Sequence, residues 1–427
     1  MNRFGTVATL AFVLVAGACS APGKPDPSPA EARQPQAGSS DRVVLRDGRG
    51  SGATPYAVVD GGTGTVLFRL PAGVPAADWH VLFATGPSGT STVVRAIDPN
   101  GGAVQREISV AGVWQLPSIG LARMPGGLSG DGRTLVLEEL RSAGSPTTRF
   151  TVIATEGRTA PRLITLPGRF TFDALSPDGT FLYVIEHLNA NDYLVRQVDV
   201  STGQLAAGAI LDKRNVDERM AGYPATQLWG SDGWVYTVYR GTDGDFIHAL
   251  DTMRGLAVCI DLPGTEQTDE ATAGYWGLAL DATGRVLYAA NAALGRVSEV
   301  SLDGFSVTRT KTVPTAVPTA ARGVILAKLG GHDRVPGGGQ VAASADGSTL
   351  YVLGERGLTS IRVSDLASTG RLGTDRTYLG LALSTGGSLY VVDDTGGVSR
   401  VGTAVGSAST ALDGRGYSQI LAVMPTR

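Results

Sequence analysis

Charged residues and cysteines are both scarce in this sequence. Only 18% of the 427 residues are charged, the formal net charge is −3, and no dense run of Lys or Arg occurs. Because basic patches hold nucleic acids and anionic membrane surfaces, neither is an expected partner. The two cysteines are Cys19 and Cys259. The apolar neighbours of Cys259 indicate a buried thiol rather than a reactive one.

Recognisable catalytic and metal-binding motifs are missing as well. The four histidines, His80, His187, His248 and His332, are scattered and form neither His-x-His nor His-Glu-x-x-His, which excludes a compact zinc motif. No Gly-x-Ser-x-Gly elbow precedes a helix, and no Gly-x-x-x-x-Gly-Lys loop occurs. A serine hydrolase and a phosphate-binding loop therefore lack their sequence context. We expect no catalytic residue, metal or cofactor from these motifs.

Glycine, proline and apolar residues are abundant, and they recur in a regular order. With 59 glycines, 22 prolines and 42% hydrophobic residues, the chain is expected to be ordered and rich in β-strands. An apolar strand, a short Gly-containing turn and a second strand follow one another repeatedly, most clearly over 175–184. The centres of the second strands are 39 to 63 residues apart, at Leu82, Leu135, Leu182, Val235, Leu287, Leu350 and Leu389. This spacing is typical of propeller blades.

A third strand follows each of these units, and counting it gives eight copies. The extra copy lies in 43–71, which has no innermost strand of its own, while 419–423 is a terminal strand without partners. Pairing the two would close the ring and remove its open edges. We therefore predict an all-β fold, a propeller of eight four-stranded blades in a single domain over 43–427. Seven blades is the alternative, if 43–71 is an addition to the first blade.

The N-terminus has the pattern of an export signal. Arg3 precedes an apolar segment, 7–16, that is too short to span a bilayer as a retained helix. Small residues before Cys19 resemble the lipobox of bacterial lipoproteins, which implies that 1–18 is removed and Cys19 is lipidated. An ordinary secretory signal is the alternative. The Pro-rich segment 19–42 is predicted to be a disordered tether, so the protein would be anchored to the cell membrane, facing outside the cytoplasm.

The repeats resemble those of the YVTN-type and TolB-like β-propeller families of exported bacterial proteins. The likeness rests on Ser-Pro-Asp-Gly at 176–179, on Leu-Tyr-Val at 182–184, 350–352 and 389–391, and on 198–203. No Trp-Asp dipeptide occurs, so the WD-type repeat is a less similar relative. The resemblance implies the architecture but no activity.

Candidate ligand-binding residues come from the irregular segments between the repeats. The Asp residues of the repeated turns suit hairpins and need no metal to explain them. Three long outer-to-inner loops, 212–219, 265–270 and 312–339, belong to adjacent blades and are expected on the face around the channel. Aromatic residues open several inner strands beside them. The candidates for the channel face are Phe170, Arg214, Arg219, Tyr223, Glu266, Tyr275, Trp276, Arg322, His332, Tyr378 and Tyr417.

Two classes of function fit these features. The absence of catalytic motifs favours a non-enzymatic module that binds a protein, a peptide or an envelope glycan at the channel face. The alternative is a propeller enzyme of the hydrolase or lactonase type, in which carboxylates from several blades converge in the channel with perturbed pKa values. A quinone-dependent dehydrogenase is less favoured, because its recurring tryptophan motif is not visible among the five Trp residues.

Overall fold

The chain divides into two units, Met1–Gly38 and Ser39–Arg427, and the described residues all belong to the second. The computed structural model describes 41–48, 55–120, 124–140, 144–189, 192–212, 220–230, 232–266, 270–313, 341–353, 357–374, 376–403, 409–412 and 416–424. In these residues the second unit is almost entirely β-structure, with one short helix, α1 (Glu270–Ala273).

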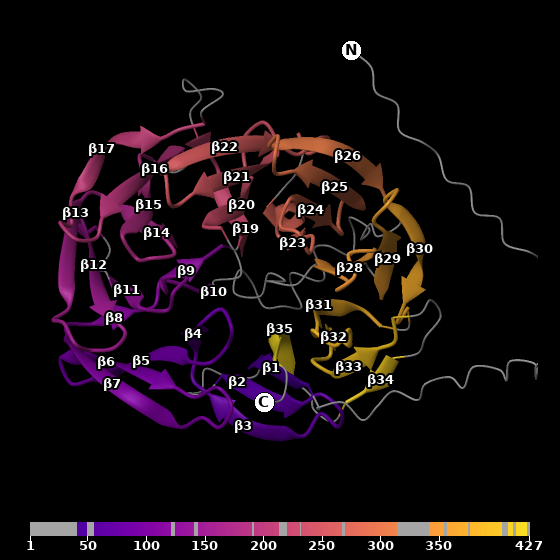
Figure 1. Ribbon diagram of the computed structural model, residues 1–427, viewed down its shortest axis with the longest axis horizontal. Coiled ribbons are helices and arrows are strands. Elements are labelled where there is room, and N and C mark those ends of the chain that lie inside the picture. Colours follow the sequence, from indigo (N-terminus) through magenta and orange to yellow (C-terminus); the bar gives the residue numbers. More distant parts are fainter. Residues whose placement is uncertain are drawn as a thin grey trace, which may run out of the picture. The chain divides into compact units, whose positions relative to one another are not determined.

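Eight four-stranded antiparallel sheets form the blades of a ring (Figure 1). In order of blades 1 to 8, the innermost strands are β35 (Tyr417–Met424), β4 (Gly73–Pro75), β8 (Trp114–Gln115), β14 (Phe170–Leu175), β19 (Tyr223–Trp229), β23 (Trp276–Leu280), β27 (Val341–Ala343) and β31 (Tyr378–Leu383). The second strands are β1 (Arg42–Asp47), β5 (Leu82–Ser88), β11 (Thr134–Glu139), β15 (Phe181–His187), β20 (Trp234–Arg240), β24 (Val286–Asn291), β28 (Thr349–Leu353) and β32 (Leu389–Asp393).

The outer half of each blade follows the same order. The third strands are β2 (Tyr56–Asp60), β6 (Ser91–Ile97), β12 (Thr147–Ala154), β16 (Asp192–Asp199), β21 (Asp245–Asp251), β25 (Arg296–Ser301), β29 (Leu358–Arg362) and β33 (Val398–Val401). The outermost strands are β3 (Val66–Leu70), β7 (Val104–Ala111), β13 (Arg162–Pro167), β17 (Leu205–Ile210), β22 (Leu256–Asp261), β26 (Ser306–Thr312), β30 (Ala367–Leu372) and β34 (Ser409–Ala411). Three further short strands are β9 (Ser118–Ile119), β10 (Met124–Pro125) and β18 (Met220–Ala221).

Blade 1 is a composite of the two ends of the ring. The C-terminal strand β35 pairs antiparallel with β1, with Val43 opposite Val423 and Leu45 opposite Ile420. The prediction of eight blades closed by terminal strands is therefore confirmed, and the alternative of seven is wrong. Closure of this kind leaves no unpaired innermost strand at the seam of the ring.

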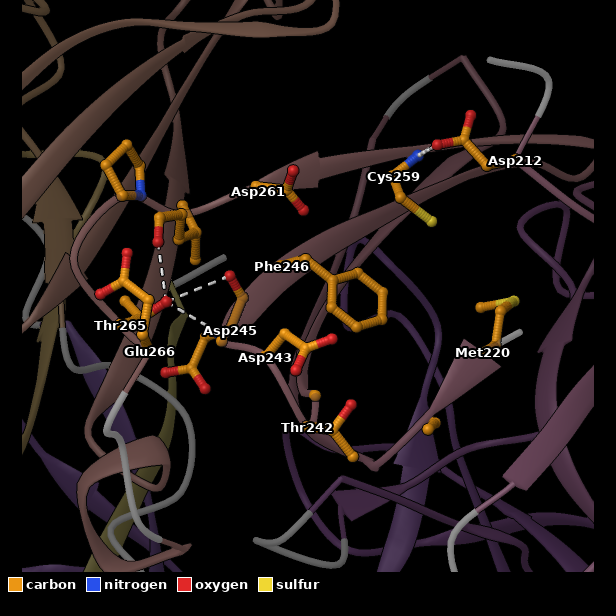
Figure 2. A pocket seen from close by; sticks show the side chains of 15 residues that line it. Asp212, Met220, Thr242, Asp243, Asp245, Phe246, Cys259, Asp261, Thr265 and Glu266 are labelled. Atoms are coloured by element: carbon orange, nitrogen blue, oxygen red, sulfur yellow. Dashed lines mark hydrogen bonds between the residues drawn. The ribbon is translucent and has the colours of Figure 1, made fainter. Parts of the chain in front are cut away.

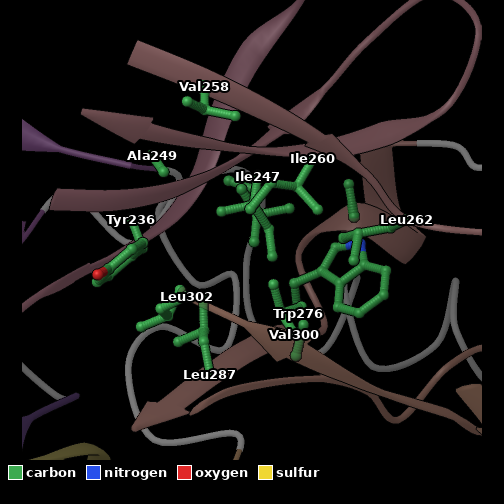
Figure 3. Packing of buried hydrophobic residues seen from close by; sticks show 14 residues of the cluster. Tyr236, Ile247, Ala249, Val258, Ile260, Leu262, Trp276, Leu287, Val300 and Leu302 are labelled. Carbon is green, nitrogen blue, oxygen red and sulfur yellow. The ribbon is translucent and has the colours of Figure 1, made fainter. Parts of the chain in front are cut away.

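The hydrophobic core consists of clusters between neighbouring blades rather than one central mass. Figure 3 shows such a cluster, in which Ile247 and Ile260 of blade 5 face Trp276 and Leu287 of blade 6. Second strands are therefore apolar on both faces, because each blade is covered by a neighbour on either side. This explains the continuous apolar run that begins at Phe181.

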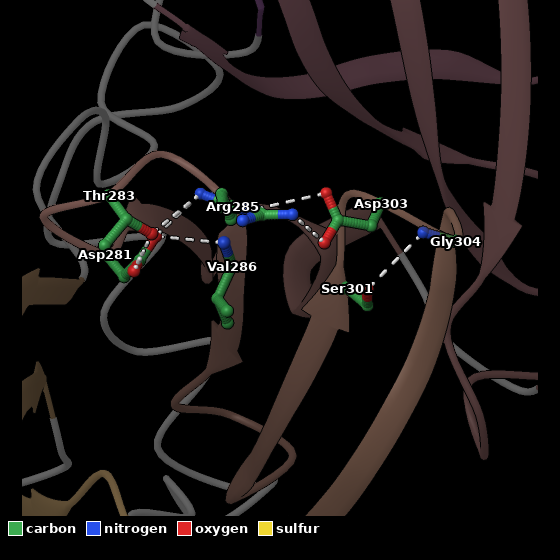
Figure 4. Close-up of polar contacts among 7 residues, drawn as sticks. All are labelled: Asp281, Thr283, Arg285, Val286, Ser301, Asp303 and Gly304. Atoms are coloured by element: carbon green, nitrogen blue, oxygen red, sulfur yellow. Dashed lines mark hydrogen bonds and ion pairs between the residues drawn. The ribbon is translucent and has the colours of Figure 1, made fainter. Parts of the chain in front are cut away.

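The Asp carboxylates of the repeated turns accept hydrogen bonds from residues of the same turn. In blade 4, the Ser176 hydroxyl donates to Asp178 Oδ1 over 2.7 Å, and the Thr180 amide donates to the same oxygen. In blade 6, Asp281 Oδ1 accepts from the amides of Arg285 and Val286 at 2.9 Å (Figure 4). These Asp side chains satisfy backbone donors in turns, which is an ordinary structural role.

Candidate functional site

The long loops and the second-to-third-strand turns share one side of the ring, here called the loop face. Strand direction alternates within each antiparallel blade, so these connections lie opposite the inner-to-second-strand turns. Of the predicted loop residues, Glu266 is described and exposed. Arg214, Arg219, Arg322 and His332 lie outside the described residues, as does Cys19.

The predicted aromatic residues stand at or beside the first residue of inner strands. Their exposed fractions are 1% for Phe170, 5% for Tyr275, 1% for Trp276, 4% for Tyr378 and 4% for Tyr417. Tyr223, at the start of β19, is half-buried. Protein therefore covers five of these rings, which pack the loop-face ends of the blades.

A pocket of about 410 Å³ opens on the loop face between blades 4 and 5 (Figure 2). Its walls come from the segment after β17, from β18, from the turn between β20 and β21, and from the segment after β22. Two of the three predicted loops thus contribute described residues, Asp212 and Glu266, to one hollow.

The pocket exists because the connection between blades 4 and 5 takes an indirect course. After β17, Asp212 forms a parallel bridge with Ala257 of β22, and its Oδ2 accepts the Cys259 amide at 3.2 Å. The chain later returns to blade 4, where β18 pairs with β16. Gly222 then has φ +117°, and a Cβ there would lie 1.8 Å from the Arg240 carbonyl oxygen, so only glycine fits this close approach.

Five carboxylates give the pocket a strongly acidic lining. The buried Asp245 accepts from Trp276 Nε1 at 2.7 Å and lies 3.8 Å from Arg240 Nε. Asp243, Asp261 and Glu266 are exposed, and none of the three has an ion-pair partner in the part of the chain that the structure describes. Together with Asp212, these groups favour a cation or a positively charged ligand.

The half-buried Cys259 thiol lines this pocket, and a buried histidine contacts it from the neighbouring strand. His248 in β21 and Cys259 in β22 are cross-strand partners, with 3.7 Å between His248 Nδ1 and Cys259 Sγ. Burial lowers the pKa of His248 to about 4, against an opposing effect of the Asp212 charge. The imidazole is therefore neutral at neutral pH. The expectation that Cys259 is buried is corrected, since its side chain reaches the pocket.

The interface between blades 4 and 5 holds one more unusual group nearer the channel. Asp173 in β14 occupies a bulge, is 4% exposed, and has its pKa raised to about 7 by burial. Burial, with a smaller contribution from the Asp173 charge, raises the pKa of Tyr193 and Tyr239, whose rings stack with 5.1 Å between centroids. Among the described innermost strands, Asp173 is the only carboxylate.

A hairpin from blade 3 extends toward the centre of the ring (Figure 1). β8 is interrupted, and β9 and β10 form a two-stranded sheet before the chain returns to pair with β11 (Figure 1). Met124 Sδ lies 3.3 Å from Gln419 Nε2 of blade 1, while β9 contacts β14 of blade 4 and β19 of blade 5. Sequence reasoning missed this insertion, although Pro117, Pro125 and the glycines at 126–127 mark its ends.

No family model and no curated protein matches this chain. Three solved structures illustrate its similarities. Dihydro-heme d1 dehydrogenase NirN in complex with DHE is 14% identical, with a TM-score of 0.53 over 92% of this chain and 76% of that one. AztD from Citrobacter koseri is 15% identical, with a TM-score of 0.50 over 91% of this chain and 99% of that one. TolB from Acinetobacter baumannii is 14% identical, with a TM-score of 0.36 over 62% of both chains. At these identities the likeness extends to the propeller fold alone.

Proposed function

We propose that this protein is a lipid-anchored, extracytoplasmic binding module, whose loop face holds a protein, a peptide or an envelope glycan. The observation that carries the proposal is the acidic pocket of about 410 Å³ between blades 4 and 5. Its exposed carboxylates select a ligand with basic or hydrogen-bond-donating groups, and the half-buried Phe246 offers a ring face for stacking.

The arrangement of the channel supports binding over catalysis. Hydrolysis by carboxylates, as in glycosidases, uses a pair of carboxyl groups that flank the reacting bond. Among the described innermost strands only Asp173 supplies a carboxylate, and the β9–β10 hairpin occupies part of the space beside it. The hydrolase or lactonase alternative would require further groups from several blades at this position.

The N-terminal pattern supports the location. A lipidated Cys19 followed by a Pro-rich tether would hold the propeller clear of the membrane surface. In the described residues, no helix is long and apolar enough to cross a membrane. The anchor in this proposal is the lipid on Cys19.

Position-specific crosslinking tests the binding face. The photoreactive residue p-benzoylphenylalanine is placed in the full-length chain at Thr242, which is exposed on the loop face, or at Ala282, which is exposed on the opposite face. After irradiation of intact cells, we expect a discrete crosslinked species from the Thr242 position and none from Ala282. Equal labelling at both positions, or none at Thr242, would reject the loop face as the binding surface.

A further inference from the structure

A row of aromatic rings leads from the interface between blades 4 and 5 to the pocket. Tyr193 of β16 stacks on Tyr239 of β20, with 5.1 Å between ring centroids and 17° between ring planes. Tyr239 in turn stacks on Phe246 of β21, with 5.6 Å between centroids and 12° between planes. The two tyrosine rings are buried, whereas Phe246 is half-buried and lines the pocket (Figure 2). The buried neighbours therefore hold the Phe246 ring in place, and the exposed part of that ring faces the hollow.

A carboxylate stands next to this ring, on the side opposite Tyr239. Phe246 is the cross-strand partner of Tyr239 in β20 and of Asp261 in β22. Cross-strand partners project from the same side of a sheet with Cβ atoms about 5 Å apart, so the Asp261 carboxylate lies beside the ring. Asp261 is exposed and lines the same pocket. A ligand that fills the hollow thus meets an aromatic ring and a carboxylate side by side.

The charges around the hollow are of one sign. Among the described residues, five carboxyl groups line the pocket, and no lysine, arginine or histidine does. Arg240 lies 3.8 Å from the buried Asp245 and balances that group. Asp243, Asp261 and Glu266 are exposed to the hollow, so they attract a cationic ligand.

The groups that line the pocket distinguish between the possible cations. Within the described residues, no group of three or more His, Cys, Asp and Glu side chains could hold a metal ion. A guanidinium is planar and weakly hydrated, stacks on aromatic rings, and offers five N–H donors to carboxylates. An ammonium is a compact, strongly hydrated point charge that gains less from a ring. A ring beside a carboxylate therefore favours the guanidinium of an arginine.

An exposed apolar side chain next to the pocket favours a polypeptide over a free small cation. Leu188 follows β15 and is exposed, and its amide donates to the Asp192 carbonyl oxygen at 3.0 Å. Asp192 is the cross-strand partner of Ala221, which lines the pocket. Leu188 therefore stands beside the wall that β18 contributes, where an apolar residue adjacent to the arginine would pack.

We propose that the pocket receives an arginine side chain of a polypeptide partner, whose guanidinium stacks on Phe246 and donates to Asp261. Asp243 and Glu266 supply further acceptors, and an apolar residue next to the arginine packs on Leu188. This inference rests on the binding function proposed above and names the chemistry of the ligand.

Isothermal titration calorimetry on the full-length chain with Cys19→Ser tests this selectivity. The probes are the peptides Ala-Arg-Leu-Ala, Ala-Lys-Leu-Ala and Ala-citrulline-Leu-Ala, each with blocked termini. We expect the arginine peptide to bind at least about 10-fold more tightly than the citrulline peptide, which has the same shape but lacks the charge. It should bind about 2–5-fold more tightly than the lysine peptide, which stacks less well on the ring.

Variants of the pocket locate the contacts. Asp261→Asn should weaken binding of the arginine peptide by at least about 10-fold, and Phe246→Leu by about 2–5-fold. Phe68→Leu replaces a half-buried ring of blade 1, and Asp394→Asn replaces an exposed carboxylate of blade 8. These two variants are the matched controls and should leave the affinity unchanged.

Fluorine NMR with 4-fluorophenylalanine at position 246 keeps the proposal testable if Phe246→Leu does not fold. The resonance should shift on addition of the arginine peptide and much less with the citrulline peptide. Equal binding of these two peptides, an equal or higher affinity for the lysine peptide, no binding of the arginine peptide, or no shift at position 246 would overturn the site. N-acetyl-arginine amide that binds as tightly as the arginine peptide would overturn the polypeptide partner. Crosslinking from Thr242 does not depend on the chemistry of the ligand, so a crosslinked partner without arginine selectivity would refute this inference alone.

Discussion

Replacing Asp173 by Asn should stabilise the protein, and increasingly so as the pH rises. Asp173 is a buried carboxyl whose pKa is raised from 3.8 to about 7. The folded state therefore holds a proton that the unfolded chain has already released between these two values. The contribution of the Asp173 carboxyl to the free energy of unfolding is fully present below pH 3.8 and is lost as the pH rises through about 7. An amide of the same shape cannot ionise, so the variant escapes this loss.

The size of the effect follows from the pKa difference. The span from 3.8 to about 7 is roughly three pKa units, and at about 1.36 kcal/mol for each it corresponds to about 4 kcal/mol. The gain of Asp173→Asn should be near zero at pH 4 and approach this value at pH 8. His248 acts in the opposite direction, since its lowered pKa makes stability rise with pH between about 4 and 6.5. It titrates in both proteins and cancels from the comparison.

Guanidinium denaturation at a series of pH values measures this difference. The midpoint of Asp173→Asn should exceed that of wild type at pH 8 and converge with it at pH 4. Asp243→Asn, at an exposed carboxylate, is the control and should show no such divergence. A variant that is equally or less stable than wild type at pH 8 would refute the reasoning, because Asp173 would then be compensated by charge partners when ionised.

Three further predictions concern the ring, the pocket and the anchor. Deleting 417–424 removes β35 and exposes β1 together with the hydrophobic cluster around Val43 and Leu45. The variant should therefore lose cooperative unfolding and aggregate in gel filtration. A monomer that melts like wild type would contradict closure of the ring by β35. Gly222→Ala should lower the free energy of unfolding by about 3 kcal/mol or more, because the new Cβ would collide with the Arg240 carbonyl oxygen. Gly284→Ala should lower it by about 1–2 kcal/mol, because φ is also positive there but the space is open. Denaturation midpoints that rank the two variants in the reverse order would argue against the close approach. Cys19→Ser should move the protein from the membrane fraction to the soluble fraction after cell lysis, and unchanged sedimentation with membranes would disprove the lipid anchor.

The architecture could be predicted because the blades repeat. Seven apolar residues, the first of them Leu82 and the last Leu389, each lie in the second strand of one blade, and only blade 1 lacks such a residue. The unpaired terminal strand at 419–423 indicated that blade 1 is a composite. Local patterns of this kind reflect strand pairing within a blade, which involves residues close in sequence.

The site was less predictable because it depends on contacts that no repeat encodes. Asp212, Met220 and Cys259 line one pocket because of the detour between blades 4 and 5, and only Gly222 hints at the close approach involved. The pKa of Asp173 likewise depends on a bulge in β14 and on the neighbouring blade. Aromatic residues such as Trp276 were located correctly at strand starts, but their burial reflects the packing of adjacent blades.

The most direct measurement of the central claim is crosslinking from Thr242 in two forms of the full-length protein in intact cells. One form has the wild-type pocket, and the other carries Asp243→Asn, Asp261→Asn and Glu266→Gln together. If the loop face binds its ligand through the acidic pocket, the crosslinked species forms in the first and falls at least about 10-fold in the second, since each charge-assisted contact contributes about 1.5 kcal/mol or more. Equal yields from the two forms would contradict the account.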